Sequence, residues 1–166
     1  MKNLLQTVIV MWVGVLCVGC GPRLDKWQLD RPELAKAAGT VTLNGQPLKE
    51  AVITFFPVTG SHSAFAKSDA KGSYVLTTFD PDDGAVAGDY KVTVSKLDIQ
   101  YEADPVSPYT APPLYHSEQS LVPDEFGDSQ TTKLTASVPT SGSEAIDLAL
   151  TGPEGKLKIL TNRRGK

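Results

Sequence analysis

The chain has 166 residues, of which 40% are hydrophobic and 21% are charged, proportions typical of a single globular domain. Its formal net charge is −3, which argues against a nucleic-acid-binding protein, because such proteins concentrate basic charge to meet phosphates. Its 12 prolines and 14 glycines indicate many turns and favour an all-β domain over a helical one.

The N-terminus has the pattern of an export signal. Lys2 is followed by an apolar run that ends at Gly19-Cys20-Gly21-Pro22. This run is shorter than the ~20 apolar residues needed to cross a bilayer. We therefore predict a cleaved leader over residues 1–19.

Val18-Gly19-Cys20 resembles the bacterial lipobox, in which small residues precede a cysteine that receives diacylglycerol before the leader is cut. The resemblance implies that Cys20 begins the mature chain and that its acyl chains hold the protein to a membrane. An ordinary signal peptide with a free Cys20 and an uncleaved anchor are the alternatives. Cys17, the only other cysteine, leaves with the leader, so no disulfide is expected.

Residues 20–38 are mostly polar and are predicted to form a tether between the membrane and the domain. A short helix over residues 33–38, opened by Pro32 and closed by Gly39, is the alternative. Trp27 is expected either to dock on the domain or to sit at the lipid interface.

The stretch from Thr40 to Leu97 has the pattern of successive β-strands. Residues 40–43 alternate, and Asn44-Gly45 follows them as a strong signal for a two-residue hairpin turn. Residues 51–56 are apolar on both faces, which predicts a central strand covered on both sides.

Two further strands are expected in this stretch. Residues 73–78 are rich in β-branched and aromatic side chains, and residues 90–95 alternate with Tyr90, Val92 and Val94 on one face.

These segments resemble the carboxypeptidase-regulatory-like, or transthyretin-like, domain. The shared pattern falls on Gly39, Gly45, Pro47, Ala51, Asp69, Gly72, Tyr74, Gly88, Tyr90 and Val92. The resemblance implies a seven-stranded antiparallel Greek-key sandwich over residues 39–152, of a usually noncatalytic family. With the lipobox, the chain resembles the small lipoproteins of this type that are abundant in planctomycete-type bacteria.

Residues 98–128 contain five prolines, and proline cannot donate to a β-ladder. We predict a long loop there. Its exposed rings, Tyr101, Tyr109 and Tyr115, are a candidate binding surface for a glycan or a peptide. The alternative is that the rings pack along the edge of the sandwich.

The end of the chain has two alternating segments, residues 133–138 and 146–150, which predict a terminal hairpin across Ser141-Gly142-Ser143. Residues 153–166 are basic and are predicted to be a mobile, solvated tail. Contact with anionic lipid or another envelope polymer is the alternative.

Few residues suggest chemistry. Asp80, Asp82 and Asp83 are a weak candidate for a calcium loop, against the alternative of ordinary turn-forming aspartates. His62 and His116 are far apart, so no zinc site is predicted. Ser61-His62-Ser63 places a base beside hydroxyls, but no nucleophile motif surrounds it. No cofactor is expected.

The sequence thus predicts a noncatalytic, lipid-anchored envelope protein whose β-sandwich binds an unknown envelope protein or glycan or has a structural role. The first alternative is a carbohydrate- or peptide-binding accessory protein that uses the tyrosines of residues 98–128. The second is an enzyme or inhibitor whose site does not show in the sequence.

Overall fold

The computed structural model describes residues 31–163, and residues 33–163 belong to one compact unit. The predicted leader, Cys20 and Trp27 lie outside the described residues, as does most of the predicted tether. In the part that is described, no helix has the length and hydropathy needed to cross a membrane.

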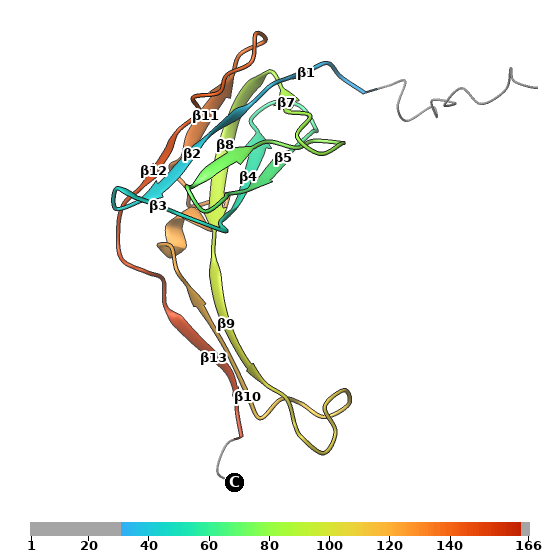
Figure 1. Ribbon diagram of the computed structural model, residues 1–166, viewed down its shortest axis with the longest axis vertical. Helices are drawn as coiled ribbons and strands as arrows, with labels where there is room; N and C mark the ends of the chain where they lie inside the picture. The colour runs from blue at the N-terminus through green and yellow to red at the C-terminus, as the bar shows by residue number, and fades with distance from the viewer. Residues whose placement is uncertain (1–30, 164–166) are drawn as a thin grey trace, which may run out of the picture. The chain divides into compact units, whose positions relative to one another are not determined.

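Strands make up nearly all of the regular structure (Figure 1). In chain order the elements are β1 (Leu34–Ala35), β2 (Ala38–Leu43), β3 (Gln46–Pro47), β4 (Val52–Pro57), β5 (Ala64–Lys67), β6 (Ser73–Val75), β7 (Ala85–Val86), β8 (Gly88–Ser95), β9 (Leu97–Glu102), β10 (Tyr115–Ser120), the 3₁₀ helix η1 (Asp124–Phe126), β11 (Thr135–Val138), β12 (Leu148–Leu150) and β13 (Leu157–Asn162). The prediction of an all-β domain is confirmed.

Two sheets enclose the core. One has the strand order β11-β8-β4-β5, and in the other β2 pairs with β12, β3 and β6. All of these pairs are antiparallel except β12–β2, which is parallel. The expectation of a wholly antiparallel sandwich is therefore wrong at this one pair. The reason is that β12 reaches β2 by a crossover from the other sheet.

The first turn is as predicted. Asn44 and Gly45 have φ angles of 52° and 79°, the left-handed values that a tight two-residue hairpin turn requires at both positions. Thr42 lies opposite Pro47 in the resulting β2–β3 pair. The Asn44 amide also exchanges hydrogen bonds with the backbone of Gly152, at 3.0 and 3.1 Å.

The core is apolar, and the polar ends of its aromatic residues are satisfied. The Tyr74 hydroxyl donates to the Ile146 carbonyl at 2.5 Å, and the Tyr90 hydroxyl donates to Val86 at 2.6 Å. Burial raises the pKa of Tyr74, and the Asp147 charge raises it further, so this hydroxyl remains a donor. The largest fully buried side chains include Tyr90, Phe55, Ile53, Leu76, Leu150, Val41, Val92 and Val94, which confirms the inward row expected for residues 90–95.

Strand β4 is central within its sheet, since it pairs with both β5 and β8. However, it is covered on one face only. Ile53 and Phe55 are fully buried, whereas Val52 and Phe56 on the opposite face are 49% and 38% exposed. The prediction of cover on both sides is wrong, because a two-layer sandwich leaves the outer face of each sheet to solvent.

The predicted terminal hairpin is also absent. Strand β11 pairs with β8 in one sheet and β12 pairs with β2 in the other. The turn between them docks on the start of the domain instead: Ser143 donates to the Lys36 carbonyl at 2.8 Å and accepts from Ala38 at 2.9 Å. The alternation of apolar and polar residues identifies a strand but does not show which distant strand it pairs with.

Residues 33–38 form no helix. Leu34 and Ala35 pair with Val86 and Ala85 as the short sheet β1–β7, and the Ala35 side chain is buried. The last residues of the predicted tether are thus part of the domain.

Two predictions are wrong over much of their length: the long loop over residues 98–128 and the mobile tail over residues 153–166 both contain strands. Strands β9, β10 and β13 form a separate antiparallel sheet with β10 in the centre, and they lie side by side in Figure 1. All five prolines of residues 98–128 lie outside the strands, so the ladder keeps its donors. We call β9, β10, β13 and the connecting residues 103–114 the arm, and residues 103–114 the tip.

Gly39 in β2 lies close to the backbone of Ile146, more than a hundred residues later in the chain. A Cβ added there would lie against the backbone carbonyl of Ile146, well inside van der Waals contact. We expect Gly39→Ala to lower the free energy of unfolding by at least about 2 kcal/mol, because backbone atoms must shift to admit the methyl group.

The matched control is Gly127→Ala. Gly127 has a φ of −80°, and an added Cβ would meet its nearest atom, the Asp124 carbonyl oxygen, at 3.5 Å. Urea unfolding followed by fluorescence measures both variants. Equal stability of the two variants would contradict the close approach at Gly39.

Candidate binding surface

The arm exposes apolar side chains on both of its faces. Because side chains alternate along a strand, Leu97, Ile99 and Tyr101 of β9 share one face. Leu157 and Ile159 of β13 lie on the other face. They pair with residues of β10 that in turn pair with Asp98 and Gln100 of β9, whose side chains point away from the Ile99 row. Ile99 is 54% exposed and Ile159 is 56% exposed. Exposed apolar rows of this kind make the arm a candidate interaction surface.

The three tyrosines predicted as a binding surface are not brought together. Tyr101 pairs with His116, and their rings meet edge to face with centroids 5.7 Å apart. Tyr115 pairs with Glu102 and so lies on the other face of the arm. Tyr109 is in the tip and is 97% exposed. A flat stacking platform made of all three rings is therefore excluded by their positions.

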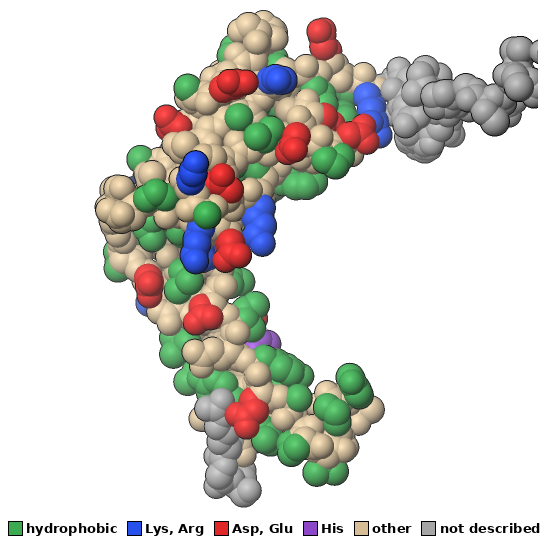
Figure 2. Space-filling view, in the orientation of Figure 1, with side chains coloured by type: hydrophobic (Ala, Val, Ile, Leu, Met, Phe, Trp, Pro, Cys, Tyr) green, Lys and Arg blue, Asp and Glu red, His purple; other side chains and the backbone are tan. Residues whose placement is uncertain are grey.

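The tip combines exposed apolar side chains with an ordered backbone. Val106 is 88% exposed, close to the value for Tyr109. The Asp104 carboxylate accepts hydrogen bonds from the backbone of Val106 at 2.9 Å and of Ser107 at 3.3 Å, and Ala111 donates to the Ser107 carbonyl at 3.0 Å. In Figure 2 apolar side chains gather around this loop, at the lower right.

Arg163 fastens the tip to the end of β13. Its guanidinium donates to the Pro112 carbonyl at 2.7 Å and lies 3.4 Å from the Asp104 carboxylate, while its backbone donates to the Leu114 carbonyl at 2.7 Å. Sequence reasoning placed Arg163 in a mobile tail and missed this role. The alternation of Leu157, Lys158 and Ile159 was the available signal that a strand precedes it.

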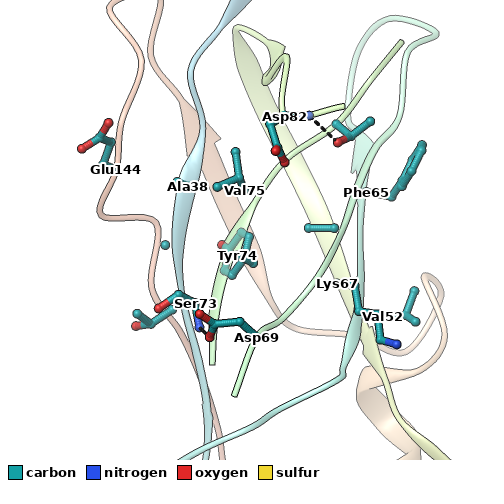
Figure 3. A pocket seen from close by; sticks show the side chains of 14 residues that line it. Ala38, Val52, Phe65, Lys67, Asp69, Ser73, Tyr74, Val75, Asp82 and Glu144 are labelled. Atoms are coloured by element: carbon teal, nitrogen blue, oxygen red, sulfur yellow. Dashed lines mark hydrogen bonds between the residues drawn. The ribbon is translucent and has the colours of Figure 1, made fainter. Parts of the chain in front are cut away.

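A second candidate is an open groove of about 920 Å³ beside β5 and β6 (Figure 3). Phe65 and Val75 contribute apolar surface, and Lys67, Asp69 and Asp82 contribute charge of both signs. Phe65 also exchanges backbone hydrogen bonds with Thr77, at 2.9 and 2.8 Å. The edge of β5 is therefore partly closed at this point, which limits what an added strand would find there.

The histidine noted in the sequence has local partners. The Ser61 hydroxyl lies 3.3 Å from the Nδ1 of His62, and the His62 ring meets Phe79 edge to face at 5.3 Å. Asp89 lines the same small pocket. Among the described residues no hydrogen bond joins His62 to a carboxylate, so the third group that orients a catalytic base is not in place.

The three aspartates of the calcium candidate are not arranged around one point. The Asp83 carboxylate accepts backbone hydrogen bonds from Thr78, Phe79 and Asp80 at 2.7, 2.9 and 2.7 Å, so it shapes its own loop. Asp82 instead lines the groove (Figure 3). Within residues 31–163 no three His, Cys, Asp or Glu side chains are placed to hold a metal ion.

Asp83 makes the stability of this loop depend on pH. Burial alone would raise the pKa of its carboxyl, but the backbone hydrogen bonds outweigh burial, and the pKa is lowered. A lowered pKa in the folded state gives stability that is complete above the unfolded value of about 3.9 and is lost as the pH falls through the folded value.

We expect Asp83→Asn to lower the free energy of unfolding by about 2 kcal/mol at pH 7, because one amide oxygen replaces two acceptors and the amide N–H groups face backbone donors. The deficit should shrink as the pH falls below about 4. Urea titrations between pH 2.5 and 7 test this.

Asp82→Asn is the control for this experiment, since the Asp82 side chain accepts none of these backbone hydrogen bonds. A pH-independent deficit in Asp83→Asn, or an equal one in Asp82→Asn, would contradict the assignment.

The sequence matches no family model and no curated protein. Among solved structures, it is similar to part of a 9R-lipoxygenase from Cyanothece PCC8801, with 14% identity and a TM-score of 0.31 over 89% of this chain and 20% of that one. The chain spans about a fifth of the length of that lipoxygenase. Similarity at this level carries no argument about fold or activity.

Proposed function

We propose that this protein is a noncatalytic lipoprotein of the cell envelope, held to a membrane by acyl chains on Cys20, whose β-sandwich presents the arm to a partner. The lipobox-like Val18-Gly19-Cys20 supports the anchor. The observation that carries the binding role is the tip, where Val106 and Tyr109 are exposed on a loop that Arg163 holds in place.

We further propose that the sandwich is of the carboxypeptidase-regulatory-like, transthyretin-like type. Its two layers are a sheet of β4, β5, β8 and β11 and a sheet of β2, β6 and β12 to which the two-residue strand β3 is added. Consecutive strands repeatedly change layer, as when β3 is followed by β4, β5 by β6, and β11 by β12. Such crossovers between sheets support a Greek-key arrangement.

The physical argument for binding rests on pre-organisation. A binding loop that is already ordered loses little conformational entropy when its partner arrives. Tyrosine and valine then supply contact area, and tyrosine adds a hydroxyl that can hydrogen-bond. A protein or peptide partner fits this surface best, because two exposed apolar side chains, Val106 and Tyr109, can insert into a pocket on the surface of a protein partner.

A glycan is the second candidate, and Tyr109 is the observation that favours it, because an exposed ring can stack on a sugar. Of the three tyrosines, Tyr109 alone has a ring that is almost fully exposed for stacking. Tyr101→Ala would then leave binding unchanged, whereas Tyr109→Ala would abolish it.

The anchor is tested by intact mass and detergent-phase partitioning of the full chain expressed in a bacterium. The wild type should carry acyl mass and enter the detergent phase, and Cys20→Ala should do neither. Cys17→Ala is the matched control, because it removes the other cysteine and should still be acylated. Equal behaviour of Cys20→Ala and the wild type would overturn the anchor.

The binding role is tested by placing a photo-crosslinking amino acid at position 109 and irradiating intact cells. A defined adduct is expected, and adding Val106→Ser should reduce its yield about tenfold, as for a central interface residue. Sensitivity of the adduct to protease or to glycosidase identifies the partner as protein or glycan.

The control for this experiment is the same crosslinker at position 65, because Phe65 is an exposed aromatic residue of the sandwich. Similar adducts from both positions, or an adduct that Val106→Ser leaves unchanged, would contradict a role for the tip.

A further inference from the structure

The arm has two open edges. Strand β10 is paired on both sides, so β9 and β13 are its outer strands, and among residues 31–163 no other strand pairs with either of them. Leu121 donates to the Lys96 carbonyl at 2.8 Å, so Lys96 bonds towards β10. Because the direction alternates along an antiparallel strand, Leu97, Ile99 and Tyr101 direct their backbone groups towards the open edge of β9.

The apolar rows of the two edge strands lie on opposite faces of the arm. Ile99 pairs with Glu118, which pairs with Lys158, so these three side chains share one face. Gln100 pairs with Ser117, which pairs with Ile159, so these share the other. At these residues each face is apolar at one edge and polar at the opposite edge, while exposed Leu160 of β13 falls at the register shift of the β10–β13 pair, where the alternation is interrupted.

The charges of the two edge strands are opposite as well. Strand β9 carries Asp98 and Glu102, on the face opposite its apolar row. Strand β13 carries Lys158, also on the face opposite its apolar row. One edge of the arm is thus acidic and the other is basic, with the same division of apolar and charged faces.

We propose that the open edge of β9 pairs with the open edge of β13 from a second copy of this chain that is turned over relative to the first. Turning the copy over brings the Ile159 row beside the Ile99 row and joins two half-exposed apolar strips into one. It also places Lys158 of that copy on the face that carries Asp98 and Glu102. Edge-to-edge addition completes the backbone ladder, as in other strand-addition complexes.

Other arrangements of two copies are less favourable. Pairing β9 with β9 would bring two acidic rows together on one face, and like charges on neighbouring strands are destabilising. A copy that is not turned over would set Lys158 beside the apolar row of Ile99. The contact is heterologous, because β9 of one copy meets β13 of the next, so it leaves a free edge at each end.

Disulfide trapping in cells that express the full chain tests this pairing. The variant Ile99→Cys/Ile159→Cys replaces two side chains that are each more than half exposed. Within one copy the two positions are separated by two strand spacings, about 9.6 Å, beyond the ~7 Å that a disulfide spans. Mild oxidation should therefore produce a ladder of dimers, trimers and larger species on a non-reducing gel.

The single variants Ile99→Cys and Ile159→Cys are the controls for symmetric pairing, and the wild type reports background from Cys17 and Cys20. Neither single variant should form a ladder. A double variant that stays monomeric would overturn the proposal, and so would a dimer formed as readily by Ile99→Cys alone.

Charge reversal gives an independent test in the same double-cysteine background. Asp98→Lys alone and Lys158→Glu alone should each reduce the ladder several-fold. Co-expression of the two reversed chains should restore it, because the lysine at position 98 of one chain then meets the glutamate at position 158 of the other. Restoration also shows that both variants fold, and a ladder insensitive to these changes would refute the pairing.

Discussion

The carbonyl group of Ile146 is the point on which the sandwich depends. It accepts the Tyr74 hydroxyl at 2.5 Å, and it lies so close to Gly39 that no side chain fits between them. Since Gly39 belongs to β2 and Ile146 leads into β12, this contact sets the parallel register of β2 and β12. Strand β12 can therefore pair with β2 in this register only because β2 has no Cβ at position 39.

The local features of the fold could be predicted from the sequence. Asn44-Gly45 specified a turn because few residue pairs tolerate two left-handed conformations, and the alternation of Tyr90, Val92 and Val94 specified one buried face. The partner of each strand could not be predicted. Residues 133–138 and 146–150 look like a hairpin, yet β11 pairs with β8 and β12 with β2, and hydrophobic burial in two layers does not depend on which strands are neighbours in sequence.

The arm shows a different limit of sequence reasoning. Proline density correctly marked residues 103–114 as irregular, but it obscured the strands on either side. For the candidate tyrosines the sequence left exposure and packing along the sandwich edge as alternatives, and Tyr101 and Tyr109 are exposed. Their separation could not be predicted, because it depends on the pairing of β9 with β10. Arg163 escaped notice because its partners, Asp104 and Pro112, lie more than fifty residues away.

The fastening of the tip by Arg163 links the arm to the order in which the ribosome makes the chain. Strands β9 and β10 and the tip emerge well before β13, so the loop cannot take its final form until the last strand has been synthesised and has paired. A protease that cuts between Gly152 and Leu157 would separate β13 from the sandwich, leaving it held by β10 and by the contacts of Arg163 with the tip. Limited proteolysis there would therefore loosen the arm without cutting any strand of the sandwich.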